Sequence, residues 1–326
     1  IRRPPRSTLS SSSAASDVYK RQIKHGSLGD IAQASGAIQD IYENHIDDQI
    51  YLLTTKPYFD LFKKNPYLTD VILDKRLSRF NLIYLFSLMR KIKKLNINKV
   101  YDLQNSSRTL FYKKILFPNT NSDKWSSSES TLPQDLSKEE FDKKPVLDRF
   151  DHQLKTSGIN TKHTMFPNFS WSCSDITKIQ TEYDLKKYIV LFPFCSPHLS
   201  SKKWPYYNEL IKIIKDKYKN EYKILVAPGP NELNDAKEFD AVSILDGEKA
   251  LDIGQLSSLI KNSSFVIAND TGPAHMAAHL NVKGITLFGS HTTAHKVSIE
   301  REKFKAIQVN DLKKLSAQKV FEKIKL

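Results

Sequence analysis

The sequence is poor in cysteine and has no long apolar run. Its two cysteines, Cys173 and Cys195, form neither a C-x-x-C pair nor any other zinc-type spacing. Because two cysteines cannot build a disulfide framework, we expect a reducing, cytoplasmic setting for this chain. No apolar run approaches the roughly 20 residues that a membrane-spanning helix needs. Tandem repeats of roughly 20 to 50 residues are missing as well, so a repeat architecture is not expected.

Residues 1–22 lack both periodicity and an apolar core. Arg and Pro residues follow Ile1, and a tract rich in Ser and Ala comes next. A secretory signal peptide needs an apolar core. We therefore interpret this stretch as a non-native or disordered leader, similar to translated cloning or adapter sequence, and exclude it from the expected fold. Only Ile23, Lys24 and His25 then remain for the first strand, which we expect to be incomplete.

Acidic residues are fewer than basic ones. The chain holds 36 Asp and Glu against 50 Lys and Arg, which gives a formal net charge of +14. One interpretation is a solvated, Lys-rich surface, because lysines are scattered through most of the expected helices. The other is an anionic partner, such as nucleic acid, phospholipid or a phosphorylated glycolipid. An RNP-type aromatic motif and a clustered basic helix are both missing, so we expect no nucleic-acid partner.

The most informative stretch runs from residue 265 to residue 289. Residues 265–268 form a short apolar run, residues 269–273 are typical of a turn, residues 274–280 indicate a small-residue helix, and residues 284–288 form a second apolar run. This order is the strand–loop–helix–strand unit of a doubly wound sheet. In the turn, Thr271 can cap the helix, Gly272 allows close approach to the backbone, and Pro273 suits the first helical turn. The N-terminus of the helix is therefore a candidate anion site.

The same alternation of strands and helices occurs twice along the chain. The expected strands are residues 49–53, 71–73, 99–103, 188–192, 222–227, 241–245 and 306–309, besides the two above. The expected helices are residues 31–42, 58–64, 81–94, 109–116, 145–157, 204–218, 233–239, 253–261 and 316–325. Residues 118–144 are polar and predict a long loop. Residues 158–183, rich in Asn, Thr, Ser and Pro, indicate a linker. We expect one domain over residues 23–157 and a second over residues 184–326.

The run from Asp270 to His275, followed by Gly289, resembles the signature of glycosyltransferase family 9, the ADP-heptose:lipopolysaccharide heptosyltransferases. The resemblance covers roughly residues 23–326 and is thin between residues 118 and 144. It implies an α/β protein of GT-B architecture, with two facing Rossmann-like domains, parallel sheets and an interdomain cleft. It also implies an inverting enzyme that needs no metal or cofactor and transfers a sugar from an ADP-sugar, with ADP-heptose as the first candidate.

The resemblance assigns the donor site to the second domain. Lys202, in Lys-Lys-Trp-Pro after Ser200 and Ser201, matches the family's lysine, and the three residues would contact a diphosphate. The alternative is an exposed lysine beside a packed Trp204. Glu232, after a Gly-Pro turn, would accept hydrogen bonds from the ribose hydroxyls, or else complement a helix dipole. The remaining donor-side residues that match the family are Asp270, Thr271, Gly272 and His275.

The acceptor side belongs to the first domain in this resemblance. Ser27-Leu28-Gly29-Asp30 matches a family turn whose aspartate acts as the general base, and Arg108 ends a second matching turn, so we expect Ser27, Gly29 and Arg108 near the acceptor. For Asp30 the alternative is plain capping of the following helix. The expected acceptor is an anionic glycolipid, such as a lipopolysaccharide core. Contact with the cytoplasmic face of the inner membrane would follow.

Three alternatives stay open. A GT-B sugar-nucleotide epimerase would share the fold but need no separate acceptor. A basic nucleic-acid-binding protein would account for the charge but lacks the motifs named above. A zinc site is conceivable because His275 and His279, like His291 and His295, are spaced i, i+4. No third ligand belongs to that pattern, so we expect no metal.

Overall fold

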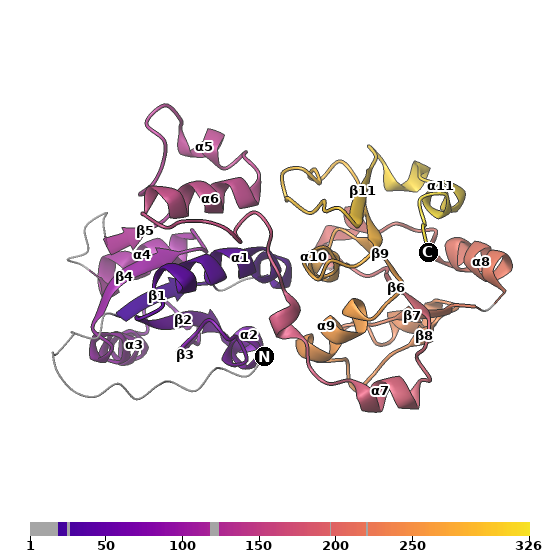
Figure 1. Ribbon diagram of the computed structural model, residues 1–326, viewed down its shortest axis with the longest axis horizontal. Helices are drawn as coiled ribbons and strands as arrows, with labels where there is room; N and C mark the ends of the chain where they lie inside the picture. Colours follow the sequence, from indigo (N-terminus) through magenta and orange to yellow (C-terminus); the bar gives the residue numbers. More distant parts are fainter. Residues whose placement is uncertain (1–18, 25–26, 118–123, 196, 220) are drawn as a thin grey trace. The chain divides into compact units, whose positions relative to one another are not determined.

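We describe a computed structural model of the chain (Figure 1) that covers residues 19–24, 27–117, 124–195, 197–219 and 221–326. Only the backbone is described for residues 19–22, 197, 198 and 200. Contacts divide the chain into two compact units, each with its own sheet. The first comprises the residues up to Gly26 together with Ala37–Lys138 and Phe150–Lys162, and the second comprises Ser27–Gly36, Glu139–Arg149 and His163–Leu326.

The sheet of the first unit is parallel throughout. Its order is β3-β2-β1-β4-β5, with the first strand in sequence at the centre. The strands are β1 (Tyr19–Ile23), β2 (Gln49–Thr55), β3 (Asp70–Asp74), β4 (Ile97–Asp102) and β5 (Trp125–Ser126). This is the strand order of a Rossmann-type half, in which crossover helices connect the parallel strands.

Strand β1 is longer than the sequence predicts. Ile23 pairs with Leu53 of β2 and with Asp102 of β4. The strand begins at Tyr19, so residues 19–22, which we expected in the leader, take part in the sheet. The reason is that a central strand is held by backbone hydrogen bonds on both sides, which any side chain permits. The rest of the expected leader, residues 1–18, lies outside the described residues.

Two helices of the first unit begin at residues whose side chains cap them. The helices of this unit are α2 (Lys56–Lys63), α3 (Leu82–Lys94), α4 (Ser107–Leu116) and most of α6 (Val146–Thr156), while α1 (Leu28–Asn44) begins in the second unit and continues in the first. The Asn81 side chain caps α3 by accepting from the N–H of Tyr84 at 3.0 Å. Ser106 and Thr109 form a reciprocal capping box at the start of α4. Local sequence therefore fixes where both helices begin.

The second unit holds a six-stranded parallel sheet of order β11-β10-β9-β6-β7-β8. Its strands are β6 (Tyr188–Phe192), β7 (Lys223–Val226), β8 (Val242–Ser243), β9 (Phe265–Asn269), β10 (Gly284–Phe288) and β11 (Phe304–Gln308). Numbered within the unit, the order is 3-2-1-4-5-6, the order of a doubly wound Rossmann sheet. Every residue of β6, β9 and β10 is buried, as a strand covered on both faces requires.

Helices α8 and α11 pack together against one set of core residues, and α9 contacts α10 (Figure 1). The helices of this unit are α7 (Thr177–Glu182), α8 (Tyr207–Tyr218), α9 (Ile253–Lys261), α10 (Gly272–His279) and α11 (Ala317–Phe321), with short α5 (Lys138–Phe141) and 3-10 turns η2 (Ser170–Ser172), η3 (Pro197–Lys202), η4 (Asp235–Glu238) and η5 (Leu312–Lys314). The strand–loop–helix–strand order predicted for residues 265–288 is confirmed by β9, α10 and β10.

Two stretches that we expected to be irregular contain regular elements. Residues 118–144, predicted as one long loop, include β5 and α5, because β5 adds to the edge of β4 by backbone pairing. Residues 158–183 include η2 and α7, and they are tied to the second unit. The Ser172 hydroxyl donates to the Ser257 hydroxyl at 2.7 Å, and the Phe169 N–H donates to the His279 carbonyl at 2.9 Å. Across the described residues, no helix is long and apolar enough to cross a membrane.

Candidate active site

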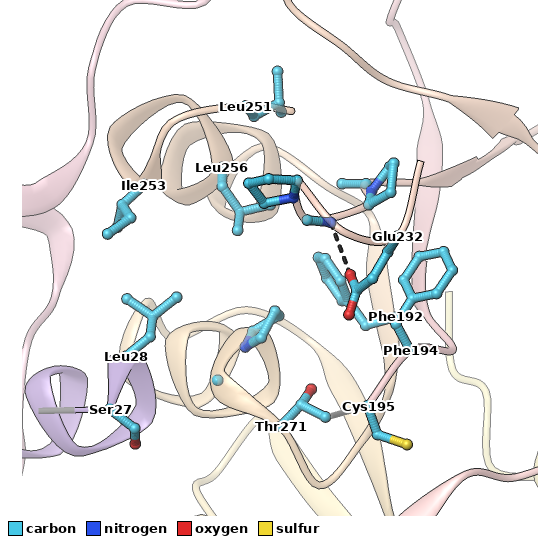
Figure 2. Close-up of a pocket in the computed structure, with 16 residues that line it drawn as sticks. Ser27, Leu28, Phe192, Phe194, Cys195, Glu232, Leu251, Ile253, Leu256 and Thr271 are labelled. Atoms are coloured by element: carbon cyan, nitrogen blue, oxygen red, sulfur yellow. Dashed lines mark hydrogen bonds between the residues drawn. The ribbon is translucent and has the colours of Figure 1, made fainter. Parts of the chain in front are cut away.

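A pocket lies where the strand order of the second unit reverses. In a doubly wound sheet this switch point is between the first and fourth strands, here β6 and β9, and ligands bind beyond the carboxyl ends of the strands there. A cavity of about 350 Å³ opens at that position, lined by segments that follow β6, β7 and β9 (Figure 2). Phe192, Phe194 and Cys195 come from the first segment, and Thr271 opens the third. The volume suits a nucleotide-sized ligand.

The N-terminus of α10 faces this pocket. Thr271 precedes the helix with an extended backbone (φ −143°, ψ 173°), and its side chain makes no capping hydrogen bond. Its hydroxyl instead donates to the carbonyl of Asn269 at 3.3 Å. The first-turn N–H groups are therefore not satisfied by a side-chain cap, and together with the helix dipole they suit an anionic ligand.

Lys202 and Asp270 meet beside that helix. The Lys202 Nζ lies 2.6 Å from Asp270 Oδ2, and the Nε2 of His291 lies 2.9 Å from the same oxygen. The Nε2 of His275 lies 3.6 Å from Asp270 Oδ1. Burial by itself would raise the pKa of Asp270, but hydrogen bonding and charge from His275 and Lys202 prevail and hold that pKa well below its usual range. The buried carboxylate is thus kept ionised and keeps the ammonium group in place.

The position of Lys202 is set by two buried neighbours. Trp204 is 1% exposed, and its indole N–H donates to the carbonyl of Leu315 at 2.8 Å. The Asn269 side chain, at the end of β9, accepts from the N–H of Trp204 at 3.3 Å and donates to the carbonyl of Pro193 at 2.8 Å. Because these bonds fasten the loop after β6 to β9, the lysine is anchored at the switch point. The alternative of an exposed lysine does not hold, since its side chain is only 20% exposed.

Glu232 lines the same pocket, after β7. Its Oε2 accepts from the N–H of Gly229 at 2.8 Å, and Figure 2 shows this bond. Burial raises the pKa of Glu232, the Gly229 N–H lowers it in part, and the charge of Asp235 raises it further. The glutamate is thereby held against its own turn, with a carboxylate at the wall of the cavity.

The turn before α1 packs on the N-terminal part of α10. A Cβ added to Gly272 would lie 3.1 Å from the Cβ of Leu28, and a Cβ added to Gly29 would lie 2.8 Å from Cδ2 of His275. Both glycines are needed for this close approach, because a side chain at either position would meet its neighbour. Ser27 and Leu28 consequently line the pocket (Figure 2). Gly272 lines it as well.

Asp30 is the third residue of α1 rather than its capping residue. Its Oδ2 accepts from the N–H of Ser27 at 3.0 Å, while the Ser27 carbonyl accepts from the N–H of Ile31 at 3.1 Å. This bond is the backward half of a capping box. The capping expected for Asp30 is therefore real, but Ser27 holds the position before the helix. A role as the base stays a prediction.

Arg108 is embedded in the first unit. Its Nε donates to the hydroxyl of Tyr112 at 2.7 Å, its Nη2 donates to the carbonyl of Leu77 at 2.8 Å, and Asp74 Oδ2 lies 3.7 Å from Nε. Only 11% of the Arg108 side chain is exposed. These contacts explain Arg108 by packing, and its place on the acceptor side stays a prediction.

The two serines before Lys202 are less informative. Ser201 is exposed at the end of η3, and the side chain of Ser200 lies outside the described residues. Their contact with a diphosphate stays a prediction. Among the four histidines considered for zinc, His279 is fully buried, which lowers its pKa well below its usual value, while His295 is exposed. His275 and His291, one from each pair, have Nε2 directed at the carboxylate of Asp270.

Several residues in the pocket or beside it were not anticipated. His291 was considered only for its spacing to His295, yet it reaches Asp270 and stacks on Phe288 with ring centroids 5.9 Å apart. Phe192 ends β6, and Phe194 and Cys195 follow it. The signal that could have found them is the strand position itself, because the switch point follows from the strand order.

Two Rossmann-type sheets in one chain, with a pocket at the switch point of the second, are the features of a GT-B protein. Comparison with known structures confirms this fold. The E. coli heptosyltransferase WaaC, solved with ADP-2-deoxy-2-fluoro heptose, matches with a TM-score of 0.68 at 16% identity, over 94% of this chain and 98% of that one. A family 9 glycosyltransferase from Veillonella parvula matches with a TM-score of 0.70 at 15% identity, over 89% and 86% of the two chains.

The sequence comparisons identify the family. The sequence model of glycosyltransferase family 9 (heptosyltransferase) matches residues 85–325, which is more than half of the chain. Lipopolysaccharide heptosyltransferase 1 of Campylobacter coli is 22% identical in an alignment that covers 86% of this chain and 87% of that protein. The chain therefore belongs to glycosyltransferase family 9, the heptosyltransferases, and is a glycosyltransferase.

Proposed function

We propose that this chain transfers heptose from ADP-heptose to a lipopolysaccharide core or a similar anionic glycolipid, with inversion at the anomeric carbon. Membership of family 9 and the likeness to WaaC, solved with an ADP-heptose analogue, support the donor. The Campylobacter coli relative, a lipopolysaccharide heptosyltransferase, supports the acceptor class. The observation that carries the proposal is the pocket at the switch point, which is lined by a helix N-terminus and by Glu232. Lys202 lies beside that helix, paired with Asp270.

The pocket offers a separate group for each part of the donor. The diphosphate would lie at the N-terminus of α10, where the N–H groups of Thr271 and Gly272 and the ammonium of Lys202 stabilise the charge that develops on the departing ADP. Glu232 would accept hydrogen bonds from the ribose hydroxyls. Asp270, His275 and His291 act indirectly in this scheme, because they hold Lys202 and the loop in place.

Asp30 is the proposed general base. Transfer with inversion needs a carboxylate that takes the proton from the acceptor hydroxyl while its oxygen attacks the anomeric carbon. Asp30 follows Ser27 and Leu28, which line the pocket, so the turn brings a carboxylate close to the donor site. Because the acceptor is a lipid, transfer would take place at a membrane surface, on the cytoplasmic side of the inner membrane.

Donor binding tests the proposal most directly. Titration calorimetry with ADP-, UDP- and GDP-linked sugars should show tighter binding of the ADP-sugars, and a preference for UDP would overturn the donor assignment. Turnover of ADP-heptose should then require a lipopolysaccharide core acceptor. Conversion of the sugar nucleotide without any acceptor would instead favour the epimerase. Activity should persist in EDTA, since the proposed stabilisation of the leaving group relies on Lys202 and backbone N–H groups.

A further inference from the structure

Helix α3 exposes apolar side chains on a face that the core does not use. Leu85, Leu88 and Ile92 are buried in the first unit and account for the inner face. Outside this face, Phe80 is 92% exposed, Ile83 86%, and Leu82 and Phe86 63% each. Of the eleven large hydrophobic residues that are exposed among the described residues, five lie between Leu77 and Phe86. Single exposed hydrophobic residues are ordinary, but a contiguous cluster marks an interaction surface.

Basic side chains surround this cluster. The exposed bases that flank it are Lys75, Arg76, Arg79, Arg90, Lys91, Lys93 and Lys94. No Asp or Glu occurs between Asp74 and Asp102. Asp74 is itself buried, and its carboxylate accepts from the hydroxyls of Tyr84 at 2.5 Å and Tyr112 at 2.8 Å. The surface is therefore apolar and basic, with no acidic residue of its own. From the sequence, the lysines could form a scattered, solvated surface or meet an anionic partner, and we expected no clustered basic helix. That last expectation is wrong, because exposed bases gather along α3.

The helix separates the two kinds of side chain along its length. Ile83, Phe86, Arg90 and Lys94 follow one another at intervals of three or four residues and so share a stripe. Its first half is apolar, and its second half is basic. A hollow of about 650 Å³ lies along this stripe, with Phe86 and Met89 beside Arg90, Lys93 and Lys94. Figure 1 shows α3 at the margin of the first unit.

We propose that this surface, residues 75–94, docks the chain on a membrane that contains anionic phospholipid. Aromatic and aliphatic side chains on one face of a helix enter the boundary between headgroups and acyl chains, and neighbouring Lys and Arg contact the anionic headgroups. Nucleic acid fits less well. Phe80 and Phe86 could stack on bases, but the exposed aliphatic side chains of Leu82 and Ile83 would find no partner on a base or a phosphate. The inference rests on the proposed function only for the lipid nature of the acceptor.

Vesicle co-sedimentation of the full chain tests this surface without donor or turnover. The chain should bind vesicles of phosphatidylcholine mixed with phosphatidylglycerol, bind phosphatidylcholine alone much more weakly, and lose binding as salt is raised. Arg90→Gln/Lys93→Gln/Lys94→Gln should weaken binding to the mixed vesicles by roughly 100-fold, given the usual attraction per basic residue. Ile83→Ser/Phe86→Ser should weaken it by roughly tenfold or more, because apolar area no longer enters the interface.

Matched variants elsewhere on the chain test whether any loss of positive charge or of an exposed apolar residue weakens vesicle binding. Lys212→Gln/Lys217→Gln/Lys323→Gln removes three exposed lysines of the second unit, and Ile46→Ser removes an isolated exposed isoleucine. Both should bind vesicles like the parent. Equal loss in the lysine control, or binding that is unchanged in both α3 variants, would overturn the proposal. Two further results would overturn the proposal. One is a dimer of the parent that becomes monomeric in Ile83→Ser/Phe86→Ser. The other is tight binding to duplex DNA without binding to vesicles. ADP binding by each variant is measured apart from vesicle binding. It reports whether the variant keeps a folded donor site.

Discussion

The ammonium group of Lys202 lies 2.6 Å from Oδ2 of Asp270, although 68 residues separate them in the sequence. The lysine comes from the turn after β6 and the aspartate from the end of β9. The two strands are neighbours in the sheet, so the pair spans the switch point where the donor is proposed to bind. In the proposed function, this ion pair holds the positive charge of Lys202 in place for the diphosphate.

Replacing Lys202 should weaken donor binding. Lys202→Ala removes a charged hydrogen-bond donor and leaves the buried Asp270 carboxylate with fewer partners. We expect a loss of about 1.5–3 kcal/mol in ADP binding, the usual scale for a hydrogen bond to a charged group, measured by titration calorimetry. Lys203→Ala is the matched control, because Lys203 is the adjacent lysine and is exposed. Equal affinity in the Lys202 variant and its parent would show that the lysine serves only the ion pair.

Glu232 should distinguish ribose from deoxyribose. In the parent, ADP should bind more tightly than 2′-deoxy-ADP, and Glu232→Gln should reduce this preference, because an amide offers one acceptor oxygen instead of two. The pKa of Glu232 is raised by burial, so protonation begins above the pH at which an ordinary glutamate titrates, about 4.3. ADP affinity should therefore fall as the pH is lowered toward that raised pKa, and it should be flat in the Gln variant. A parallel decline in both proteins would remove Glu232 from the ribose site.

Asp270 should contribute a stability that acid removes. Its pKa in the folded chain lies below the unfolded value of about 3.9, so the folded state favours the ionised form. Such a group stabilises the fold above the unfolded pKa, and the contribution is lost as the pH falls toward the folded pKa. The difference in Tm between the parent and Asp270→Asn should be constant from pH 7 to about pH 5 and shrink below about pH 4. Asp240→Asn, which breaks an exposed pair with Lys215, is the control and should change Tm little.

Gly29 should tolerate no side chain. A Cβ at this position would lie 2.8 Å from the ring of His275, which is held beside Asp270. Gly29→Ala should therefore displace His275 and destabilise the fold by about 1–3 kcal/mol, the usual cost of overpacking, in urea unfolding. A Gly29→Ala/His275→Ala double variant makes room for the new methyl group. Its loss in free energy of unfolding should therefore be smaller than the sum of the losses in the two single variants. If the losses simply add, contact with His275 is not the reason that position 29 needs glycine.

Local patterns predicted the elements that depend on their own residues. Phe265 to Ala268 is an unbroken apolar run, and Gly272 and Pro273 are typical of the start of the helix that follows, so β9 and α10 could be predicted from the sequence. Contacts between distant residues could not. Arg108 ends a turn that resembles the family's acceptor turn and lies in α4, but its partner Asp74 lies on β3, and nothing in the local sequence indicates that contact.

Backbone pairing explains the remaining differences. Strands β1 and β5 include residues with a polar, irregular pattern, and both are held by hydrogen bonds to β4 rather than by alternating side chains. A sequence pattern reports side chains that enter a core, so it misses strands that a sheet recruits through its backbone. His291 was missed for a related reason: its partner, Asp270, is identified only when the loops after β9 and β10 are placed together.

Asp30 offers the sharpest test of the proposed chemistry. Its carboxylate accepts from the N–H of Ser27, so capping and proton transfer must be separated. Asp30→Asn keeps a side-chain oxygen for that bond, and Asn stabilises helix N-termini about as well as Asp. It cannot act as a base. Thermal unfolding and ADP binding should therefore match the parent, while turnover should fall by roughly 10²–10⁴-fold, the usual contribution of general-base catalysis.

Asp30→Glu and Asp30→Ala complete this test. Glutamate keeps a base but moves it by one methylene, so part of the turnover should return relative to Asp30→Asn. Alanine removes both roles, and it should lower the free energy of unfolding by roughly 0.5–2 kcal/mol as well as turnover. Turnover that follows stability across the three variants would mean that Asp30 only supports the turn. An Asn variant as active as its parent would rule out Asp30 as the base, because the amide leaves the turn intact and accepts no proton.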